Sequence, residues 1–507
     1  MHVYWVKRDA RLRDNPALAA AARTPGPLLC LAIHEPDYWA MPEHDPSHYA
    51  FLRDGLEELD TQLRRLGQRL VHRTGGALDV LRALHRTHPI TALFSHQETG
   101  GAVTFARDRE VARWCRAEGI PWEEPTVEGV FRPHPTRDGW ARRWEARMSA
   151  PPLPPPTRLP PPPNLPCTQA PPPSELGLGP DLRTHTQRPG EAAAQRTLSD
   201  FLDRRVIGYL GGLSSPVTAP EACSRLSAYL AWGHMSLREL THALQARRAH
   251  LTAQRDAGEA VDPAWLDSLD AFAGRLRWRN HFMQKLEDEP ELEVRNLHPL
   301  YDGLRLEDPA RWRDAHHERL DAWRVGRTGW PLVDATMRCL HHTGWAPFRM
   351  RALVVSSATW LLWLHWRQVG LALAPLFLDY EPGIHWPQLQ MQAGTAGINQ
   401  IRIYNPSKQV LDHDPDGRFL RRWVPELARV PQPWLPEPWR MPDAAQREAG
   451  CIIGRDYPAP LVDAAQAARL ARHKVERLRA RADVQREAQR VHDRHGSRMP
   501  AHKRRWR

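Results

Sequence analysis

A proline-rich segment divides this chain into two parts with different hydrophobic patterns. Prolines crowd residues 151–166, PPLPPPTRLPPPPNLP, and recur up to about residue 190. Because proline fixes φ and lacks a backbone donor, this stretch can sustain neither a helix nor a sheet ladder. We expect an extended linker over 136–190 that joins a domain at 1–135 to a domain at 191–463. A docking motif for a proline-recognising domain is the alternative interpretation.

Before the linker, short apolar runs alternate with helical patterns. The runs cover residues 3–6, 28–34, 69–75 and 91–97, and each ends in polar residues. Strands that alternate with helices form parallel sheets, and ligands bind at the carboxyl ends of such strands. The pattern predicts a Rossmann-like α/β domain, although it contains no G-x-G-x-x-G fingerprint. A ligand could lie beside the polar residues that follow two of the strands, which are His34, Glu35 and residues 96–101.

The chain after residue 190 has a helical periodicity almost throughout. Gly233, Gly344 and Gly370 fall where predicted helices stop, the usual place for a glycine just beyond a C-terminus. These features predict a large all-helical domain at 191–463. The last segment, 464–507, mixes basic and acidic residues with few large apolar ones, so we expect a basic tail that is either a solvated helix or a disordered arm.

The overall charge favours a polyanionic partner. Lys and Arg number 70 against 59 Asp and Glu, which gives a formal charge of +11. Nucleic acid is the first candidate for such a partner, and a basic tail on an otherwise neutral enzyme is the alternative. The six cysteines form no C-x-x-C pair, so the sequence predicts neither a zinc site nor a disulfide framework. Without a long apolar stretch or signal peptide, we expect a cytoplasmic monomer with no metal and no membrane contact.

Four segments of the chain have the form of sequence motifs. They are WVKRDARLRDNPAL at 5–18, SRLSAYLAWGHMS at 224–236, GRTGWPLVDATMRCLHHTGW at 326–345, and RIYNPSKQVLDHDPDGRFLRRWVPEL at 402–427. In this order and across nearly the whole chain, they resemble the motifs of the photolyase and cryptochrome family. The resemblance implies an FAD cofactor in the helical domain, and a folate or deazaflavin antenna pigment is compatible with the α/β domain.

The resemblance also implies which residues contact FAD. Ser224 and Ser227 would bind the flavin diphosphate at a helix start, and Arg351 would pair with Asp379 against the isoalloxazine ring. The full implied cofactor set is Tyr209, Ser224, Arg225, Leu226, Ser227, Arg279, Arg351, Asp379 and Glu381. Considered without the resemblance, the serines fit simple helix capping, and Arg351 fits a surface or phosphate-binding arginine.

Trp278 and Arg279 correspond to a tryptophan and arginine pair at the family's lesion-binding position. The resemblance implies that Trp278 stacks on a flipped lesion, because a wide aromatic face suits unstacked bases. It implies that Trp345 and Arg349 lie on the same DNA-binding rim. Packing within the helical core is the alternative for both tryptophans.

Three positions depart from the family pattern. Arg275 stands where cyclobutane-dimer photolyases carry a glutamate, His385 stands where an asparagine usually faces flavin N5, and Phe348 replaces another asparagine. Arg275 could donate hydrogen bonds to a lesion and stabilise its negative charge, or it could turn outward to a phosphate. We assign the catalytic positions to Trp278, Arg275 and His385.

The family's electron relay is also altered. Trp366 matches the middle of its three tryptophans, but the position next to the flavin is Leu389. Trp360, Trp363 and Trp386 lie on neighbouring helical turns and are candidates for the missing donor.

These patterns favour light-driven repair of UV-induced pyrimidine dimers by electron transfer from reduced FAD. The partner would be DNA that contains UV lesions. The alternative is a cryptochrome-like photoreceptor that binds FAD without repair, and a third interpretation is a DNA-binding protein that does not respond to light. Arg275, Phe348 and Leu389 favour the photoreceptor, whereas the basic charge favours contact with DNA.

Overall fold

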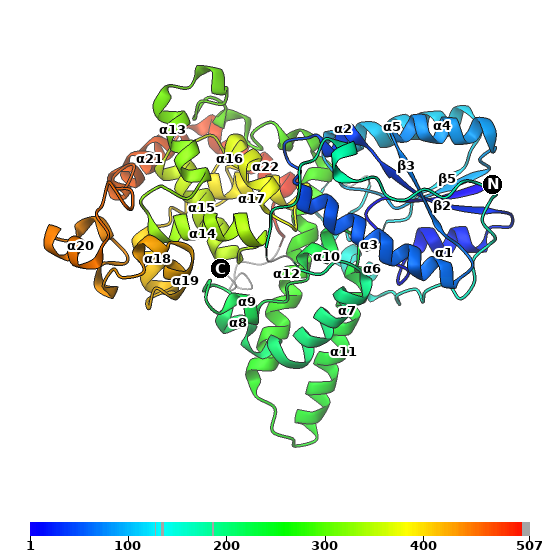
Figure 1. Ribbon diagram of the computed structural model, residues 1–507, viewed down its shortest axis with the longest axis horizontal. Helices are drawn as coiled ribbons and strands as arrows, with labels where there is room; N and C mark the ends of the chain where they lie inside the picture. The colour runs from blue at the N-terminus through cyan, green and yellow to red at the C-terminus, as the bar shows by residue number, and fades with distance from the viewer. Residues whose placement is uncertain (127, 133–135, 185–186, 499–507) are drawn as a thin grey trace.

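The computed structural model describes residues 1–126, 128–132, 136–184 and 187–498, which form an α/β part and a larger helical part (Figure 1). The α/β part contains one parallel sheet with the strand order β3-β2-β1-β4-β5. Its strands are β1 (His2–Val6), β2 (Leu28–His34), β3 (Leu70–Thr74), β4 (Ala92–Phe94) and β5 (Trp122–Glu123). The predicted α/β domain followed by an all-helical domain is confirmed.

Helices cover both faces of this sheet. They are α1 (Pro16–Arg23), α2 (Pro36–Trp39), α3 (Pro46–Arg65), α4 (Ala77–Thr87) and α5 (Ala102–Ala117). Successive side chains of β1 point to opposite faces, as the strand geometry requires. Val3 and Trp5 pack in a cluster with residues of α4 and α5. Tyr4 and Val6 pack in a second cluster with residues of α1 and α3, so the sheet is buried on both sides.

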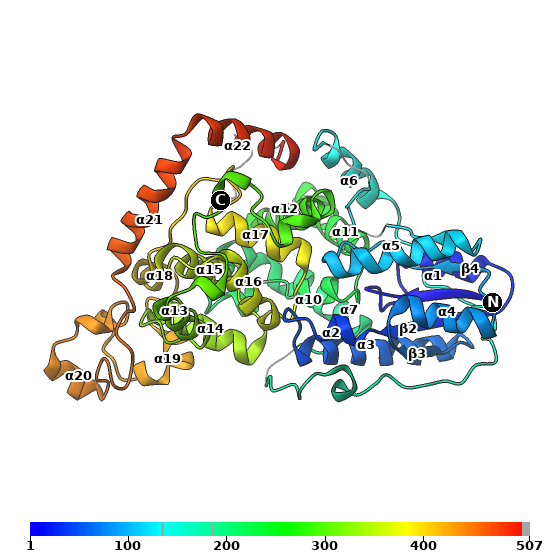
Figure 2. The ribbon, with the colours of Figure 1, turned by 90° about the horizontal axis from the view of Figure 1, so that it is seen from above.

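The proline-rich segment packs along the α/β domain (Figure 2). Pro161 accepts a backbone hydrogen bond from Leu28 at 3.0 Å, and the buried side chain of Leu165 joins the cluster under α4 and α5. The range predicted as a linker also contains α6 (Trp140–Ser149), whose tryptophans pack in a core cluster of the helical part. Much of this segment is therefore docked against other elements, and the predicted domain boundaries stay a prediction.

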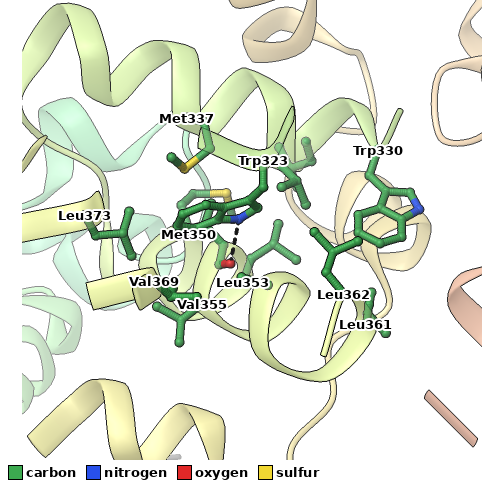
Figure 3. Close-up of a cluster of buried hydrophobic side chains, with 14 of the residues drawn as sticks. Trp323, Trp330, Met337, Met350, Leu353, Val355, Leu361, Leu362, Val369 and Leu373 are labelled. Carbon is green, nitrogen blue, oxygen red and sulfur yellow. Dashed lines mark hydrogen bonds between the residues drawn. The ribbon is translucent and has the colours of Figure 1, made fainter. Parts of the chain in front are cut away.

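The helical part surrounds two large apolar clusters. Its longer helices are α7 (Glu191–Asp200), α11 (Leu237–Asp256), α12 (Pro263–Asp288), α13 (Asp314–Arg324), α14 (Pro331–Thr343), α15 (Phe348–Ser356), α16 (Trp366–Leu373), α17 (Pro382–Ala393) and α18 (Pro406–His413). Its shorter helices are α8 (Tyr209–Gly212), α9 (Ala219–Ala222), α10 (Ser227–Ala231), α19 (Arg418–Trp423) and α20 (Asp443–Ala449), with a π-helical turn η7 at Ser357–Leu361. In one cluster, the buried indole of Trp323 donates a hydrogen bond to the Val354 carbonyl at 3.0 Å and fixes α13 against α15 (Figure 3).

The C-terminal segment forms two packed helices, α21 (Ala464–Arg479) and α22 (Ala482–His495). Val475 and Val484 are buried beside η7, and His495 contacts Glu289 at the end of α12 at 2.8 Å. Of the two alternatives for this tail, the structure therefore has helix, through residue 495. Both helices pack on the rest of the protein.

Two structural features bear on the class of protein. Among the described helices, none is long and apolar enough to cross a membrane. Within the described ranges, no group of three or more His, Cys, Asp or Glu side chains could hold a metal ion.

Candidate active site

A cavity that is open to solvent, with about 500 Å³ of empty space including its mouth, lies between α15, α17 and the loop that leads into α17. Its walls are apolar on the α15 side, from Ala352 and Val355, and charged on the loop side, from Asp379 and Glu381. Arg351 and His385 also line it. The cavity is thus lined by side chains from α15, from the loop and from α17, all within residues 348–392.

Arg351 and Asp379 form the central ion pair of this cavity. Arg351 Nη2 lies 2.9 Å from Asp379 Oδ2, and Arg351 Nε donates to the Ala346 carbonyl at 2.8 Å. Burial alone would raise the pKa of Asp379, but Arg351 outweighs it and holds that pKa below its ordinary value. Asp379 Oδ1 is buried without a hydrogen-bond partner among the described residues. A buried, ionised acceptor of this kind fits an N–H group of a ligand such as the isoalloxazine ring.

Glu381 lies next to this pair and is held by two arginines. Arg8 Nη1 and Arg279 Nη2 each lie 3.2 Å from a different carboxylate oxygen of Glu381. Arg279 also faces Glu128 at 3.5 Å. The sequence predicted Glu381 and Arg279 as site residues but missed Arg8 and Glu128, although Arg8 belongs to the family-like segment at 5–18.

His385 faces the cavity from the first turn of α17. Its Nε2 atom lies 3.0 Å from the Gly370 carbonyl, which places the imidazole N–H there. Burial lowers the pKa of His385 to about 4, so the ring is neutral near pH 7. With Nε2 as the donor to Gly370, Nδ1 is left as an acceptor on the same ring.

Cations and aromatic rings surround the same region. Arg225 has a positive φ of 60° and stacks on Trp345, with 3.9 Å between its guanidinium carbon and the ring centroid. Arg275 lies over Phe348 at 5.8 Å, and Phe348 is 40% exposed although it lines the cavity. Arg349 donates to the Tyr404 hydroxyl at 3.2 Å. Two of the departures from the family pattern, Arg275 and Phe348, are therefore neighbours in space.

Four residues of the predicted FAD set, Tyr209, Ser224, Leu226 and Ser227, have different surroundings in the structure. Ser227 begins α10, and its hydroxyl helps to stabilise the ionised Asp379. Ser224 Oγ accepts from the Leu226 N–H at 3.4 Å, as in a local turn, and Leu226 is buried in the core. Tyr209 is also buried, which raises its pKa to about 12. The assignment of this segment to the diphosphate stays a prediction.

Trp278 lies outside the lining of this cavity. Its ring contacts His281 at 4.8 Å and Phe282 at 5.9 Å between centroids, both on its own helix. Its half-buried position is compatible with a platform at the rim, and the stacking role stays a prediction.

The candidate electron donors occupy two separate places. Trp386 contacts His385 at 4.8 Å and Trp366 at 6.0 Å between ring centroids, and both indoles are fully buried. Trp360 donates to the Gln392 carbonyl at 2.7 Å, while the cations of Arg305 and Lys474 each lie 4.5 Å from the ring of Trp363. The tryptophan one layer behind the cavity wall is therefore Trp386.

The strand ends named as a ligand position are partly filled by their own side chains. His34 Nε2 lies 2.9 Å from His72 Nδ1, and Glu35 pairs with Arg107 at 2.8 Å. His96 instead borders a second cavity of about 540 Å³ between the two domains, and its Nε2 is buried without a partner among the described residues. An antenna pigment remains compatible with this part of the structure.

Comparison with known proteins matches these two parts to two family models. Residues 2–156 match the model of DNA photolyase, and residues 272–477 match the FAD binding domain of DNA photolyase. The fold and the matched domains define a flavin-binding protein.

The similar proteins include both repair enzymes and photoreceptors. Deoxyribodipyrimidine photo-lyase from Streptomyces griseus is 30% identical over 479 residues, which cover 90% of this chain and 95% of the relative. Cryptochrome-2 from Arabidopsis thaliana is 29% identical over 511 residues, covering 94% of this chain and 79% of the relative. A class III photolyase from Agrobacterium tumefaciens has a similar structure, with a TM-score of 0.79 at 27% identity, covering 94% of this chain and 98% of that one. The chain belongs to the photolyase and cryptochrome family.

Proposed function

We propose that this protein repairs UV-induced pyrimidine dimers in DNA in a light-dependent reaction at the cavity between α15 and α17. When bound and reduced, FAD supplies the electron that splits a dimer and that returns after the bonds break. Asp379 and Arg351 would orient the ring through the unpaired Asp379 oxygen. Neutral His385 would offer one ring nitrogen to the flavin, and the apolar wall of α15 would exclude water.

The observation that carries a DNA role is the exposed aromatic ring at the cavity. Phe348 is 40% exposed, and Arg275 lies over its ring. An exposed ring beside a cation suits an unstacked base and its neighbouring phosphate, because stacking on an aromatic side chain is worth about 1 to 3 kcal/mol per base. Arg349 adds a second cation on the same helix turn as Phe348. We therefore infer that a flipped nucleotide enters past Phe348.

A photoreceptor without repair is the second candidate, and Arg275 favours it. An arginine in place of the glutamate cannot accept a hydrogen bond from a lesion. Its charge lies close enough to Tyr209 to lower the pKa of that phenol against the larger effect of burial. Such a site would bind flavin and respond to light while leaving dimers intact.

The test is to illuminate the reduced protein with an oligonucleotide that contains one thymine dimer and to measure dimer loss by chromatography. Repair predicts loss in blue light and none in the dark. Photoreduction of the flavin without dimer loss would overturn repair and favour the photoreceptor. Phe348→Ala should weaken binding of the damaged oligonucleotide about ten-fold. Val325→Ala, at a position that is also exposed but lies at the end of α13, serves as its control.

A further inference from the structure

Glu381 is the one side chain shared by the linings of the two cavities described above. It lines the cavity of about 500 Å³ with Asp379 and His385, and it lines the interdomain cavity of about 540 Å³ with His96. The side chain is only 4% exposed. Because the carboxylate is buried, its orientation is set by the protein side chains that bind it and not by solvent.

The two oxygens of Glu381 are held from different domains. Arg279 reaches Oε2 from α12 of the helical domain, at 3.2 Å. Arg8 reaches Oε1 from the segment that follows β1 of the α/β domain, also at 3.2 Å, and it donates to the Tyr380 carbonyl at 3.3 Å. Arg8 thus contacts the loop that carries Asp379 and Glu381 at two adjacent residues.

Arg8 sits in a slot that the helical domain provides. Its guanidinium carbon lies 5.2 Å from the ring centroid of Trp232, which is fully buried. The next residue, Gly233, has a φ of +76°, and a Cβ atom there would lie 2.0 Å from the Arg8 carbonyl oxygen. A side chain at 233 would push the two domains apart, so glycine permits the close approach that delivers Arg8 to Glu381.

We propose that Arg8 is a positioning residue of the flavin site, through which the α/β domain orients Glu381 and adds one positive charge beside the flavin. The proposal rests on the proposed function, because it places the flavin in the cavity that Asp379 and Glu381 line. Paired arginines hold a carboxylate in one orientation, and a fixed cation in a buried site favours a ring that gains negative charge on reduction. Loss of Arg8 leaves Glu381 held on one oxygen and makes its surroundings one charge more negative.

The experiment measures the midpoint potential of the bound flavin in the full-length protein, by anaerobic titration against a redox dye. Arg8→Gln should shift the potential to a more negative value and reduce the ratio of reduced to oxidised flavin at fixed potential on the order of ten-fold. Arg8→Lys retains the charge and should restore most of that ratio. The matched control is Arg13→Gln, because Arg13 pairs with Glu239 across the same domain boundary but outside both cavities.

Thermal unfolding and FAD retention separate a flavin-specific effect from a structural one. If Arg8→Gln releases FAD while Arg13→Gln retains it, Arg8 acts at the flavin site. If Arg8→Gln and Arg13→Gln change stability equally and both keep the wild-type potential, Arg8 is an ordinary interdomain contact and the inference is wrong. A wild-type protein that neither contains nor accepts FAD overturns the proposed function itself.

Discussion

Trp386 and Trp363 have different numbers of cations beside their rings, and this difference affects how readily each can donate an electron to the flavin. Trp363 has two cations 4.5 Å from its ring, Arg305 and Lys474, whereas the cation over Trp386 is Arg367 at 5.7 Å. A tryptophan that gives up an electron becomes positive, and nearby cations disfavour that state. Because Trp386 has fewer cations nearby and contacts both His385 and Trp366, we expect it to be a better donor than Trp363.

Trp386→Phe should slow photoreduction of the flavin at least about ten-fold, because the indole one layer behind the cavity wall would be lost. Trp363→Phe should leave the rate within about two-fold and serves as the control. The measurement is the rate of flavin bleaching under blue light with an external reductant. Equal rates for wild type and Trp386→Phe, with a slow Trp363→Phe, would return the relay to Trp360 and Trp363.

Lys285 is a buried cation on α12 that has no ion pair among the described residues. Burial, together with the nearby charge of Arg137, lowers its pKa to about 7, and His281 and His495 lie in the same cluster. Between the ordinary lysine value and pH 7, the unfolded chain binds a proton that the folded chain lacks. Stability should therefore rise as the pH rises through this range.

Lys285→Met should raise the melting temperature at pH 7 and flatten its dependence between pH 7 and 10. Each pKa unit corresponds to about 1.4 kcal/mol, so the gain is at most several kcal/mol. Lys408→Met, which alters an exposed lysine on α18, is the control and should change little. Thermal unfolding of both variants across this pH range checks the prediction, and a lower melting temperature for Lys285→Met would contradict it.

The family resemblance predicted the Arg351 and Asp379 pair, because both residues follow the segment at 326–345 with the family's spacing. The contact of Arg8 with Glu381 could not be predicted in this way, because the two residues are 373 positions apart and belong to different domains. The meeting of Arg275 with Phe348 was likewise hidden, since it depends on how α12 packs beside α15. Local patterns identify residue types, whereas tertiary packing decides which of them meet.

Among the elements, the C-terminal helices show how charge patterning and packing combine. Arg469 and Arg477 are exposed on α21, whereas Ala471 and Val475 on the same helix are buried. Truncation after residue 463 would remove this apolar face together with Val484, would uncover Tyr301 and Trp360, against which these residues pack, and would destabilise the protein. A truncation therefore cannot isolate the effect of the tail on DNA binding.

Replacing Arg469 and Arg477 with Gln should weaken DNA binding and lower the slope of log affinity against log salt by roughly one to two, without a change in melting temperature. The control replaces Arg109 and Arg116, which are exposed on α5 of the α/β domain. Fluorescence anisotropy with duplex DNA at several salt concentrations gives both slopes. An unchanged slope in the α21 variant would mean that this helix lies outside the DNA interface.

The regular elements were the most predictable. Alternating apolar runs predicted four strands of the sheet, but β5 spans only Trp122–Glu123 and is too short for a periodic pattern. Helix α6 falls in the range predicted as linker, although its buried residues Trp140, Trp144 and Met148 recur at the helical spacing of four residues.

At the scale of the whole molecule, the proposed function requires a flavin in the helical domain. The Arg351 and Asp379 pair, the unpaired Asp379 oxygen and the matched FAD binding domain all point to one cavity. Arg8 extends that site to the α/β domain, so the two domains should act as one unit around the cofactor.

The most direct measurement is the flavin content of the purified wild-type protein, from its absorption spectrum and from the flavin released by denaturation. We expect a yellow protein with about one noncovalently bound FAD per chain, which denaturation releases intact. Asp379→Ala should lose most of this FAD, since Arg351 would keep a buried charge without its partner. A colourless wild-type preparation that cannot be reconstituted with FAD would contradict the proposed function.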